Sequence, residues 1–167
     1  TIISVYNKRK VAFGPRRLLS LSSAWRFGYP GTKIDQGEIN YGTKIFITGA
    51  SRGIGKSIAL LFASRGYHTF LNCSSSVDEL KKLRAYITEK YHTPCTLVPG
   101  NVGNPDHVRA IYNKIYQECT HLDVLVNNAG ISYINLLTDM TDEDWNRIIQ
   151  TNLSSVFYCC RQAIPPM

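Results

Sequence analysis

From Thr43 onward the chain alternates between two hydrophobic patterns. Short runs rich in β-branched and aromatic residues predict β-strands, and longer segments in which apolar residues recur every three or four positions predict amphipathic helices. The predicted strands cover residues 44–48, 68–73, 95–99 and 122–127. The predicted helices cover residues 54–65, 77–91, 105–119 and 141–151, with a further helix from Asn152 to Met167.

Strands that alternate with helices of this length form βαβ units, whose crossovers are right-handed and whose strands are parallel. The pattern therefore predicts an α/β fold with a parallel sheet, of which about four strands can be counted.

Residues 1–42 show no sustained hydrophobic period of either about 3.6 residues, as in a helix, or 2 residues, as in a strand. They mix Arg, Ser, Gly and aromatic residues, which predicts a poorly ordered leader that packs little. Three interpretations stay open. An early part rich in Arg and Ser is typical of an organelle transit peptide. A chain that begins at Thr1 is equally typical of an incomplete gene or an unrelated stretch translated in frame. The third interpretation is a nucleic-acid-binding arm.

The formal charge of +7 is concentrated in the leader. Residues 1–42 carry seven Lys/Arg and two acids, whereas residues 43–167 carry twelve Lys/Arg and ten acids. A nearly neutral folded part is typical of an enzyme rather than of a polyanion-binding protein. We therefore expect no nucleic-acid partner.

The lengths of the apolar runs and the positions of the cysteines limit the cellular locations that are compatible with the sequence. No apolar run approaches the ~18 residues that cross a bilayer, so no membrane span is expected. The five cysteines lie in apolar segments without a C-x-x-C motif, which favours neither a disulfide framework nor a zinc site. We expect no metal, a reducing compartment and a cytoplasmic location, or import into an organelle if the leader is a transit peptide.

A glycine-rich turn follows the first predicted strand, with the sequence Thr48-Gly-Ala-Ser-Arg-Gly-Ile-Gly55. Glycines there allow a tight turn and a close approach of backbone N–H groups to a pyrophosphate, next to the positive end of a helix. An ordinary βα turn is the alternative. The position of the turn between strand and helix favours a Rossmann-like nucleotide site.

Three motifs together resemble the short-chain dehydrogenase/reductase family over Thr43–Met167. They are the glycine turn, Asn127-Asn128-Ala129-Gly130 after the fourth strand, and Asn152, which stands 24 positions after Asn128. The amino-acid sequence from Met140 to Phe157 is most similar to that of 3-oxoacyl-[acyl-carrier-protein] reductases. The resemblance implies a Rossmann-like doubly wound sheet with strand order 3-2-1-4 and helices on both faces, a nicotinamide coenzyme and a homo-oligomeric complete protein. It also implies that residues 43–167 are the N-terminal half of the family's NADP-binding domain, so that the sheet is truncated after about four strands.

The resemblance also implies which residues bind the coenzyme. In the family Asp-Val contacts adenine, and here Asn101-Val102 keeps an acceptor oxygen but lacks the charge. The expected coenzyme-binding residues are Gly49, Ser51, Arg52, Gly53, Ile54, Gly55, Ser74, Asn101, Val102, Asn127, Ala129 and Gly130.

The end of the second strand predicts which coenzyme is bound. NAD-binding sheets place a carboxylate there to hold the ribose 2′-hydroxyl, but this strand ends Asn72-Cys-Ser-Ser-Ser76 with no acid before Asp78. Arg52 offers a fork-shaped cation suited to a 2′-phosphate, with hydroxyls of Ser51 and Ser74 nearby. A solvated surface arginine is the alternative. We expect NADP(H).

The family's catalytic groups are a Ser, an Asn that matches Asn152, and a Tyr-x-x-x-Lys pair. Tyr86 and Lys90 have this spacing but lie on the helix after the second strand, where we expect an exposed helical pair. We expect the Ser, Tyr and Lys to lie beyond Met167 and this segment alone to be inactive. For Asn152 a helix-capping role is the alternative.

Two classes of function follow. One is an NADPH-dependent reductase of a 3-oxoacyl thioester or related ketone, as in fatty acid biosynthesis, or of a sugar or steroid. The other is a non-catalytic nucleotide-binding or interaction protein.

Overall fold

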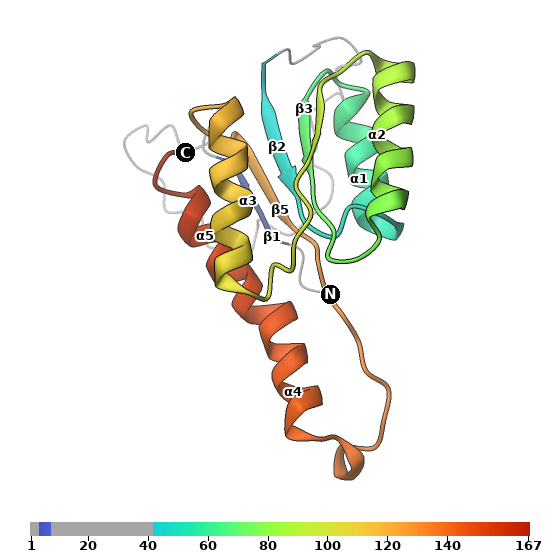
Figure 1. Cartoon of the computed structure of the whole chain (residues 1–167), viewed down its shortest axis with the longest axis vertical. Helices are drawn as coiled ribbons and strands as arrows, with labels where there is room; N and C mark the ends of the chain where they lie inside the picture. Colours follow the sequence, from blue (N-terminus) through green and yellow to red (C-terminus); the bar gives the residue numbers. More distant parts are fainter. Residues whose placement is uncertain (1–3, 8–41) are drawn as a thin grey trace, which may run out of the picture.

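A computed structural model describes residues 4–7 and 42–167 (Figure 1). Five strands form one sheet in the order β1-β5-β2-β3-β4. The strands are β1 (Ser4–Asn7), β2 (Lys44–Ile47), β3 (His68–Leu71), β4 (Cys95–Leu97) and β5 (Val124–Asn127). The α-helices are α1 (Gly53–Ala63), α2 (Val77–Tyr91), α3 (Pro105–Glu118), α4 (Asp142–Ile149) and α5 (Ser155–Ala163).

The four strands β2 to β5 are parallel. They correspond to the expected strands 1 to 4, and their order β4-β3-β2-β5 is the expected order 3-2-1-4. Ile45 lies opposite Thr69 on one side and Val124 on the other. The predicted α/β fold and strand order are therefore confirmed. Because β2 is central, the turn that follows it opens at the middle of the sheet's carboxyl edge, where doubly wound sheets bind ligands.

Side chains of the central strands alternate between two apolar layers. Phe46, Phe70 and Leu125 face α3 and α5 and are fully buried. Their neighbours Ile45 and Ile47 face α1 and α2 in a second buried cluster. Figure 1 shows α1 and α2 on one side of the sheet and α3 and α5 on the other. The sheet is thus doubly wound.

Strand β1 differs from the prediction. The leader was expected to pack little and the outer edge of β5 to lack a neighbour, but Ser4–Asn7 pairs antiparallel with Val124–Asn127. All four residues of β5 are buried. Without β1, the backbone N–H and C=O groups along the outer edge of β5 would be buried without hydrogen-bond partners, which is unfavourable. Pairing with β1 supplies these partners. The rest of the expected leader lies outside the described residues.

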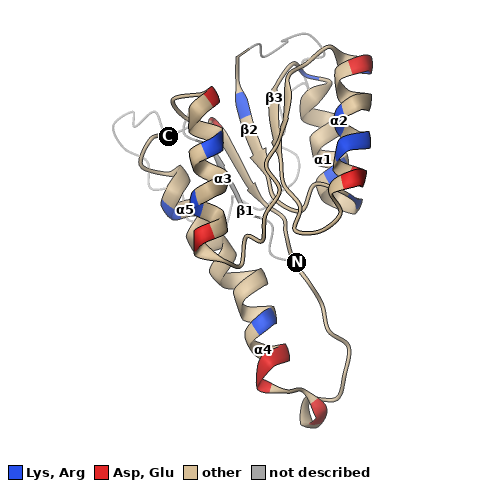
Figure 2. Cartoon of the chain, in the orientation of Figure 1, with Lys and Arg blue, Asp and Glu red and all other residues tan. Residues whose placement is uncertain are grey.

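The last predicted helices form one continuous rod. Helix α4 runs into the π-helical turn η4 (Gln150–Ser154), which runs into α5. With the preceding residues 130–141, which include the short 3-10 helix η3 (Leu137–Asp139), α4 forms an arm that projects from the sheet (Figure 1). Figure 2 shows acidic residues gathered at the outer end of this arm, where Thr141 caps α4.

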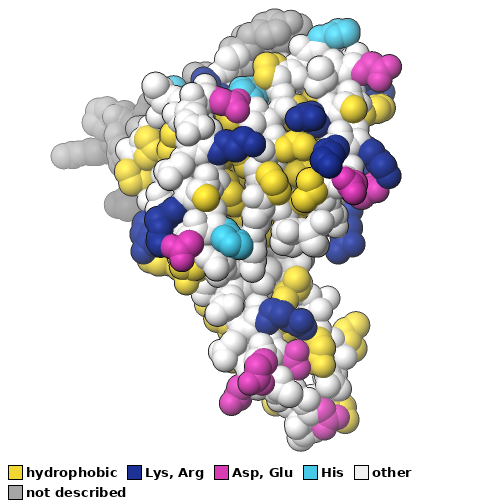
Figure 3. Space-filling view, in the orientation of Figure 1, with side chains coloured by type: hydrophobic (Ala, Val, Ile, Leu, Met, Phe, Trp, Pro, Cys, Tyr) yellow, Lys and Arg dark blue, Asp and Glu magenta, His cyan; other side chains and the backbone are white. Residues whose placement is uncertain are grey.

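Apolar side chains are exposed on the arm and along α5. Figure 3 shows several of them on the arm beside its carboxylates. Ile134, Leu137, Trp145, Phe157 and Ile164 are all at least 45% exposed. An incomplete domain leads one to expect exposure of Val156, Phe157 and Ile164; Phe157 and Ile164 are exposed, whereas Val156 is half-buried. Among the described residues, no helix is both long enough and apolar enough to span a bilayer.

Candidate functional site

The glycine turn between β2 and α1 is packed against the end of β5. A Cβ at Gly49, whose φ is +64°, would lie 2.9 Å from the Cα of Ala129. A Cβ at Gly55 would lie 2.3 Å from the Gly49 carbonyl oxygen. At Gly53, with φ of +56°, the added atom would meet nothing within 4 Å. Glycine is therefore needed for close packing at Gly49 and Gly55 and for backbone conformation at Gly49 and Gly53.

A buried polar network holds this turn to β5. The Asn128 side-chain amide donates to the carbonyl oxygens of Thr48 (2.9 Å) and Gly49 (3.1 Å). The Thr48 hydroxyl accepts from the backbone N–H groups of Asn128 and Ala129, both at 2.9 Å. Hydrogen bonds between buried groups 80 positions apart fix the turn's orientation. The expected site residues did not include Asn128, although it stands inside the motif that signalled the site.

A cavity of about 600 Å³ opens over this turn at the carboxyl edge of the sheet. Of the expected site residues, those that line it are Gly49, Ser51, Arg52, Ile54, Ser74, Asn101, Val102, Ala129 and Gly130. Lining residues that were not expected are Asn72, Cys73, Ser75, Ser76, Gly100, Asn128, Ile131, Arg147 and Thr151. Segments from four parallel strands and from α4 thus meet at one site.

Four expected residues lie near the cavity without lining it. Gly53 and Gly55 begin α1, beneath the turn. Asn127 is the buried last residue of β5, and its amide nitrogen lies 3.5 Å from the Cys160 sulfur. Asn152 lies in η4, one residue beyond the lining Thr151.

The wall after β3 is polar and carries no carboxylate. The Asn72 amide donates to the carbonyl oxygens of Val98 and Gly100, each at 2.9 Å, and so ties the ends of β3 and β4 together. Cys73 and Ser74 follow it along the wall. Burial raises the pKa of the Cys73 thiol, so this group is neutral at physiological pH.

Asn101 is engaged in its own loop. Its side-chain oxygen accepts from the Gly103 N–H at 2.9 Å, and its backbone N–H donates to Nδ1 of His107 at 3.3 Å. The neighbouring Val102 is buried. Asn101 also lines the cavity, and its side-chain nitrogen is a donor that an aspartate would not supply.

Within the described part of the chain, two charged residues line the cavity, Arg52 in the glycine turn and Arg147 on α4. The turn also presents the positive end of α1, whose first turn holds no acid. The cavity is therefore suited to an anionic ligand. Arg147 was not expected because its segment reads as an ordinary amphipathic helix.

Asn152 joins η4 to the segment that follows β5. Its side-chain oxygen accepts from the Ile131 N–H, and its side-chain nitrogen donates to the Ile131 carbonyl oxygen, both at 2.8 Å. It occupies the middle of a helical rod rather than a helix start, so the side chain acts as a cross-link between segments and not as a cap.

The pair Tyr86 and Lys90 lies on α2, away from the cavity lining. The Lys90 ammonium donates to the Tyr86 hydroxyl at 2.6 Å, and this hydrogen bond raises the pKa of Lys90. Both side chains are exposed, as expected for a helical surface pair.

A parallel, doubly wound sheet with a glycine-rich turn under a cation-lined cavity defines the class of Rossmann-like nucleotide-binding domains. A family model described as short chain dehydrogenase matches residues 43–167. The chain belongs to the short-chain dehydrogenase/reductase family.

Several relatives are similar over the same region. The 3-oxoacyl-[acyl-carrier-protein] reductase FabG of Staphylococcus aureus (strain Mu50) is 40% identical over 72% of this chain and 49% of its own length. FabG of Escherichia coli (strain K12) is 41% identical over 71% of this chain and 47% of its own length. The chain thus spans about half the length of the curated relatives it matches.

Solved structures share the fold. L-Sorbose reductase from Gluconobacter frateurii, complexed with NADPH and L-sorbose, has a TM-score of 0.74 at 29% identity, covering 78% of this chain and 50% of its own. An alcohol dehydrogenase from the archaeon Thermococcus sibiricus, complexed with 5-hydroxy-NADP, has a TM-score of 0.70 at 30% identity, covering 73% and 52%.

Proposed function

We propose that this chain is the coenzyme-binding half of an NADPH-dependent reductase that acts on a 3-oxoacyl thioester or a related ketone. The observation that carries the proposal is the cavity over the glycine turn, which is lined by Arg52 and lacks a carboxylate at the end of β3. The similarity to 3-oxoacyl-[acyl-carrier-protein] reductases supports the substrate class.

The cavity fits a nicotinamide dinucleotide phosphate. The open space above Gly53 and the close packing under Gly49 leave backbone N–H groups and the start of α1 available to a pyrophosphate. Arg52 and Ser74 would hold the 2′-phosphate, with the Ser51 hydroxyl as a further donor. The bound coenzyme supplies the hydride.

The other lining residues would hold the nucleoside parts. The Asn101 amide and the Val102 side chain would contact adenine, and Ala129 and Gly130 would lie along the adenosine ribose. Asn127, Gly53, Ile54 and Gly55 would contribute through the backbone and through the packing of the turn.

Reduction of a ketone also needs a proton donor, which the family supplies from a Tyr whose pKa is lowered by a Lys. No Tyr-x-x-x-Lys pair stands between Asn152 and Met167. We therefore propose that residues 1–167 bind coenzyme without turning over substrate, and that a polypeptide extended through the downstream codons oxidises NADPH with an acetoacetyl thioester. Turnover by residues 1–167 alone would contradict this.

A sugar ketone is the second candidate substrate, favoured by the fold similarity to L-sorbose reductase. The same extended polypeptide distinguishes the two when NADPH oxidation is compared with an acetoacetyl thioester and with L-sorbose: faster turnover of L-sorbose would favour the sugar ketone. Exposed Trp145 and Phe157 support a homo-oligomer of the complete protein. A non-catalytic nucleotide-binding protein would show neither activity.

The coenzyme assignment is tested at Arg52. Replacing Arg52 by Ala removes a charge-assisted hydrogen bond to the 2′-phosphate, so NADPH binding should weaken by about 1–3 kcal/mol while NADH binding changes little. Isothermal titration with each coenzyme measures both. Arg65→Ala is the matched control, because Arg65 is an exposed arginine just past α1 that does not line the cavity. An equal loss for both coenzymes would remove Arg52 from 2′-phosphate recognition.

A further inference from the structure

We propose that Arg147 is a second coenzyme-binding cation, which holds the dinucleotide from the α4 wall of the cavity and does not depend on the 2′-phosphate. The inference rests on the proposed function, because it assumes that the cavity binds a nicotinamide dinucleotide. Its basis is the position of Arg147 in the cavity lining and the number of guanidinium N–H donors that its neighbours leave available.

The position of Arg147 follows from the course of α4. Thr151 lies one helical turn further along the rod, so the two side chains share a face. Both line the cavity together with Asn101 and Ile131. The bond between Asn152 and Ile131 fixes this face against the segment after β5. Arg147 therefore addresses the cavity from a wall that does not include the glycine turn.

The local contacts of Arg147 orient its guanidinium without occupying it. One nitrogen lies 3.4 Å from an Asp144 carboxylate oxygen, a long hydrogen bond, while the other oxygen of Asp144 accepts from the Thr141 hydroxyl at 3.0 Å. The guanidinium carbon lies 5.9 Å from the centre of the Tyr133 ring, a cation–π contact. The side chain is 60% exposed. Most of its five N–H donors are thus available to a ligand.

The charge balance of the cavity favours an anion at this wall. Among the described residues, no carboxylate and no lysine line the cavity, and its charged lining groups are Arg52 and Arg147. Asp144, which pairs with Arg147, lies outside this lining. The coenzyme has two separate anionic parts, and Arg52 with Ser74 accounts for the 2′-phosphate. A planar guanidinium on the α4 wall is suited to the remaining anionic part, the pyrophosphate oxygens that NADPH and NADH share.

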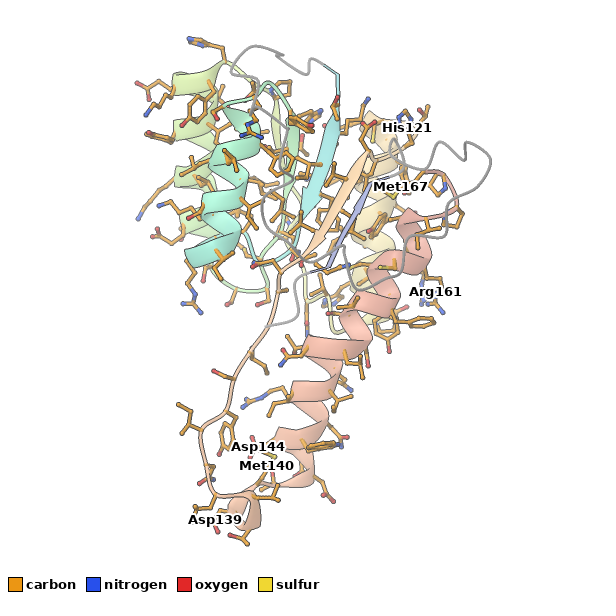
Figure 4. The ribbon with its side chains drawn as sticks, turned by 180° about the vertical axis from the view of Figure 1, so that it is seen from behind. His121, Asp139, Met140, Asp144, Arg161 and Met167 are labelled. Atoms are coloured by element: carbon orange, nitrogen blue, oxygen red, sulfur yellow. The ribbon has the colours of Figure 1, made fainter. Side chains whose placement is uncertain are left out.

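The mutation that tests this is Arg147→Gln, with Arg147→Lys as a second variant. The matched control is Arg161→Gln, because Arg161 also stacks on an aromatic ring, Phe157 at 5.0 Å, but lies on α5 outside the cavity lining. Figure 4 shows Arg161 on α5, beyond the arm, whereas Asp144, the partner of Arg147, lies within the arm.

Dissociation constants for NADPH and NADH are measured by titration calorimetry at low and at physiological salt. Loss of one charge-assisted contact corresponds to about a tenfold weakening. We expect Arg147→Gln to weaken both coenzymes by about this factor with an unchanged NADPH/NADH ratio. Arg147→Lys should recover part of the loss at low salt, and Arg161→Gln should change nothing.

The possible results separate the inference from the proposed function. If NADPH binds and Arg52→Ala loses it selectively, but Arg147→Gln binds both coenzymes like the parent, the inference is wrong and the function stands. A loss confined to NADPH would instead make Arg147 a 2′-phosphate ligand and also overturn the inference. If the parent chain binds neither coenzyme, both are wrong. Thermal unfolding of each variant shows whether a loss reflects the fold, and Arg147→Lys decides the point if Arg147→Gln unfolds.

Discussion

The two glycines at the start of α1 are subject to different constraints, although they stand two positions apart. Gly55 lies against the backbone of Gly49 and the amide of Asn128, whereas Gly53 has open space and a positive φ. Packing at Gly55 cannot relax without moving the turn, because the nearest atoms belong to backbone. The residue therefore couples the turn to β5 and sets the floor of the cavity.

Gly55→Ala should destabilise the chain severely, by about 3 kcal/mol or more, because the added methyl group overlaps backbone atoms. Gly53→Ala is the comparison and should lose only about 1–2 kcal/mol through backbone strain. Urea unfolding followed by circular dichroism measures both. Equal losses would show that conformation, not packing, limits this turn.

His68 is a second residue whose environment has a measurable consequence. Its ring stacks on Phe70 with 4.4 Å between ring centres, and its Nε2 lies 3.0 Å from the Thr96 hydroxyl. Desolvation by this burial lowers the pKa of His68 from 6.5, with Glu118 opposing the shift and Lys44 adding to it. The folded chain thus binds a proton at His68 less readily than the unfolded chain.

Stability should consequently depend on pH in one direction. The contribution of His68 is fully present above pH 6.5 and is lost as the pH falls below that value, toward the lowered pKa of the folded state. Replacing His68 by Gln should flatten the unfolding free energy between pH 7 and pH 5 relative to the parent chain. Urea titrations across this range provide the measurement. An identical slope in the variant would assign the pH dependence to other groups.

At the scale of elements, the π-helical turn η4 joins α4 to α5 and carries the cross-link to the segment after β5. A π-helical turn inserts a residue into a helix and often accompanies a functional position. Here it contains Asn152, whose two side-chain bonds to Ile131 replace backbone hydrogen bonds that an irregular segment lacks. The orientation of α4, and with it Arg147, depends on this contact.

Asn152→Leu should loosen the segment from Ile131 to Met140, because both backbone groups of Ile131 lose their partner. Hydrogen exchange measured by mass spectrometry should show faster exchange in this segment and little change in β2 to β4. If the proposed function holds, the same change in the extended polypeptide should lower turnover more than coenzyme affinity. Asn146→Leu, at an exposed position of α4, is the control. Unaltered exchange in Asn152→Leu would mean that the segment is held by other contacts.

At the scale of the whole molecule, strand β1 completes the sheet. It is antiparallel in a sheet whose other strands are parallel. It comes from the expected leader, where the short β-branched and aromatic run Ile2-Ile-Ser-Val-Tyr6 was not predicted to be a strand. Its pairing covers the outer edge of β5, the strand that carries the polar network under the glycine turn. The first residues of the chain therefore protect the edge next to the candidate site.

Deletion of residues 1–7 should expose that edge. Amides of Val124–Asn127 should exchange faster, and the shortened chain should aggregate more readily because an uncovered buried strand pairs with other chains. Hydrogen exchange and light scattering measure the two effects. Peptides from β3, which has strands on both sides, serve as the internal control. Exchange in β5 that matches the parent chain would show that β1 contributes nothing to this edge.

Much of the candidate site could be predicted because the responsible signals are local. The strand–glycine–helix succession, the missing acid before Asp78 and the run from Asn127 to Gly130 are properties of short windows, and most of the residues they singled out line one cavity. Asn72 and Arg147 were missed because nothing in their windows distinguishes a loop-tying amide or a cavity arginine from an ordinary polar residue. Asn128 was left out of the expected site although it stands inside the motif from Asn127 to Gly130.

The succession of strands and helices and the position of the glycine turn can be predicted from the sequence, because hydrophobic periodicity and glycine conformation act over a few residues. The contacts between distant groups are seen only in the folded chain: Asn128 meets Thr48 across 80 positions, Asn152 meets Ile131 across 21, and β1 pairs with β5. Periodicity reports that a residue is buried and not which partner it meets. Those pairings depend on how whole elements pack, which no short window contains.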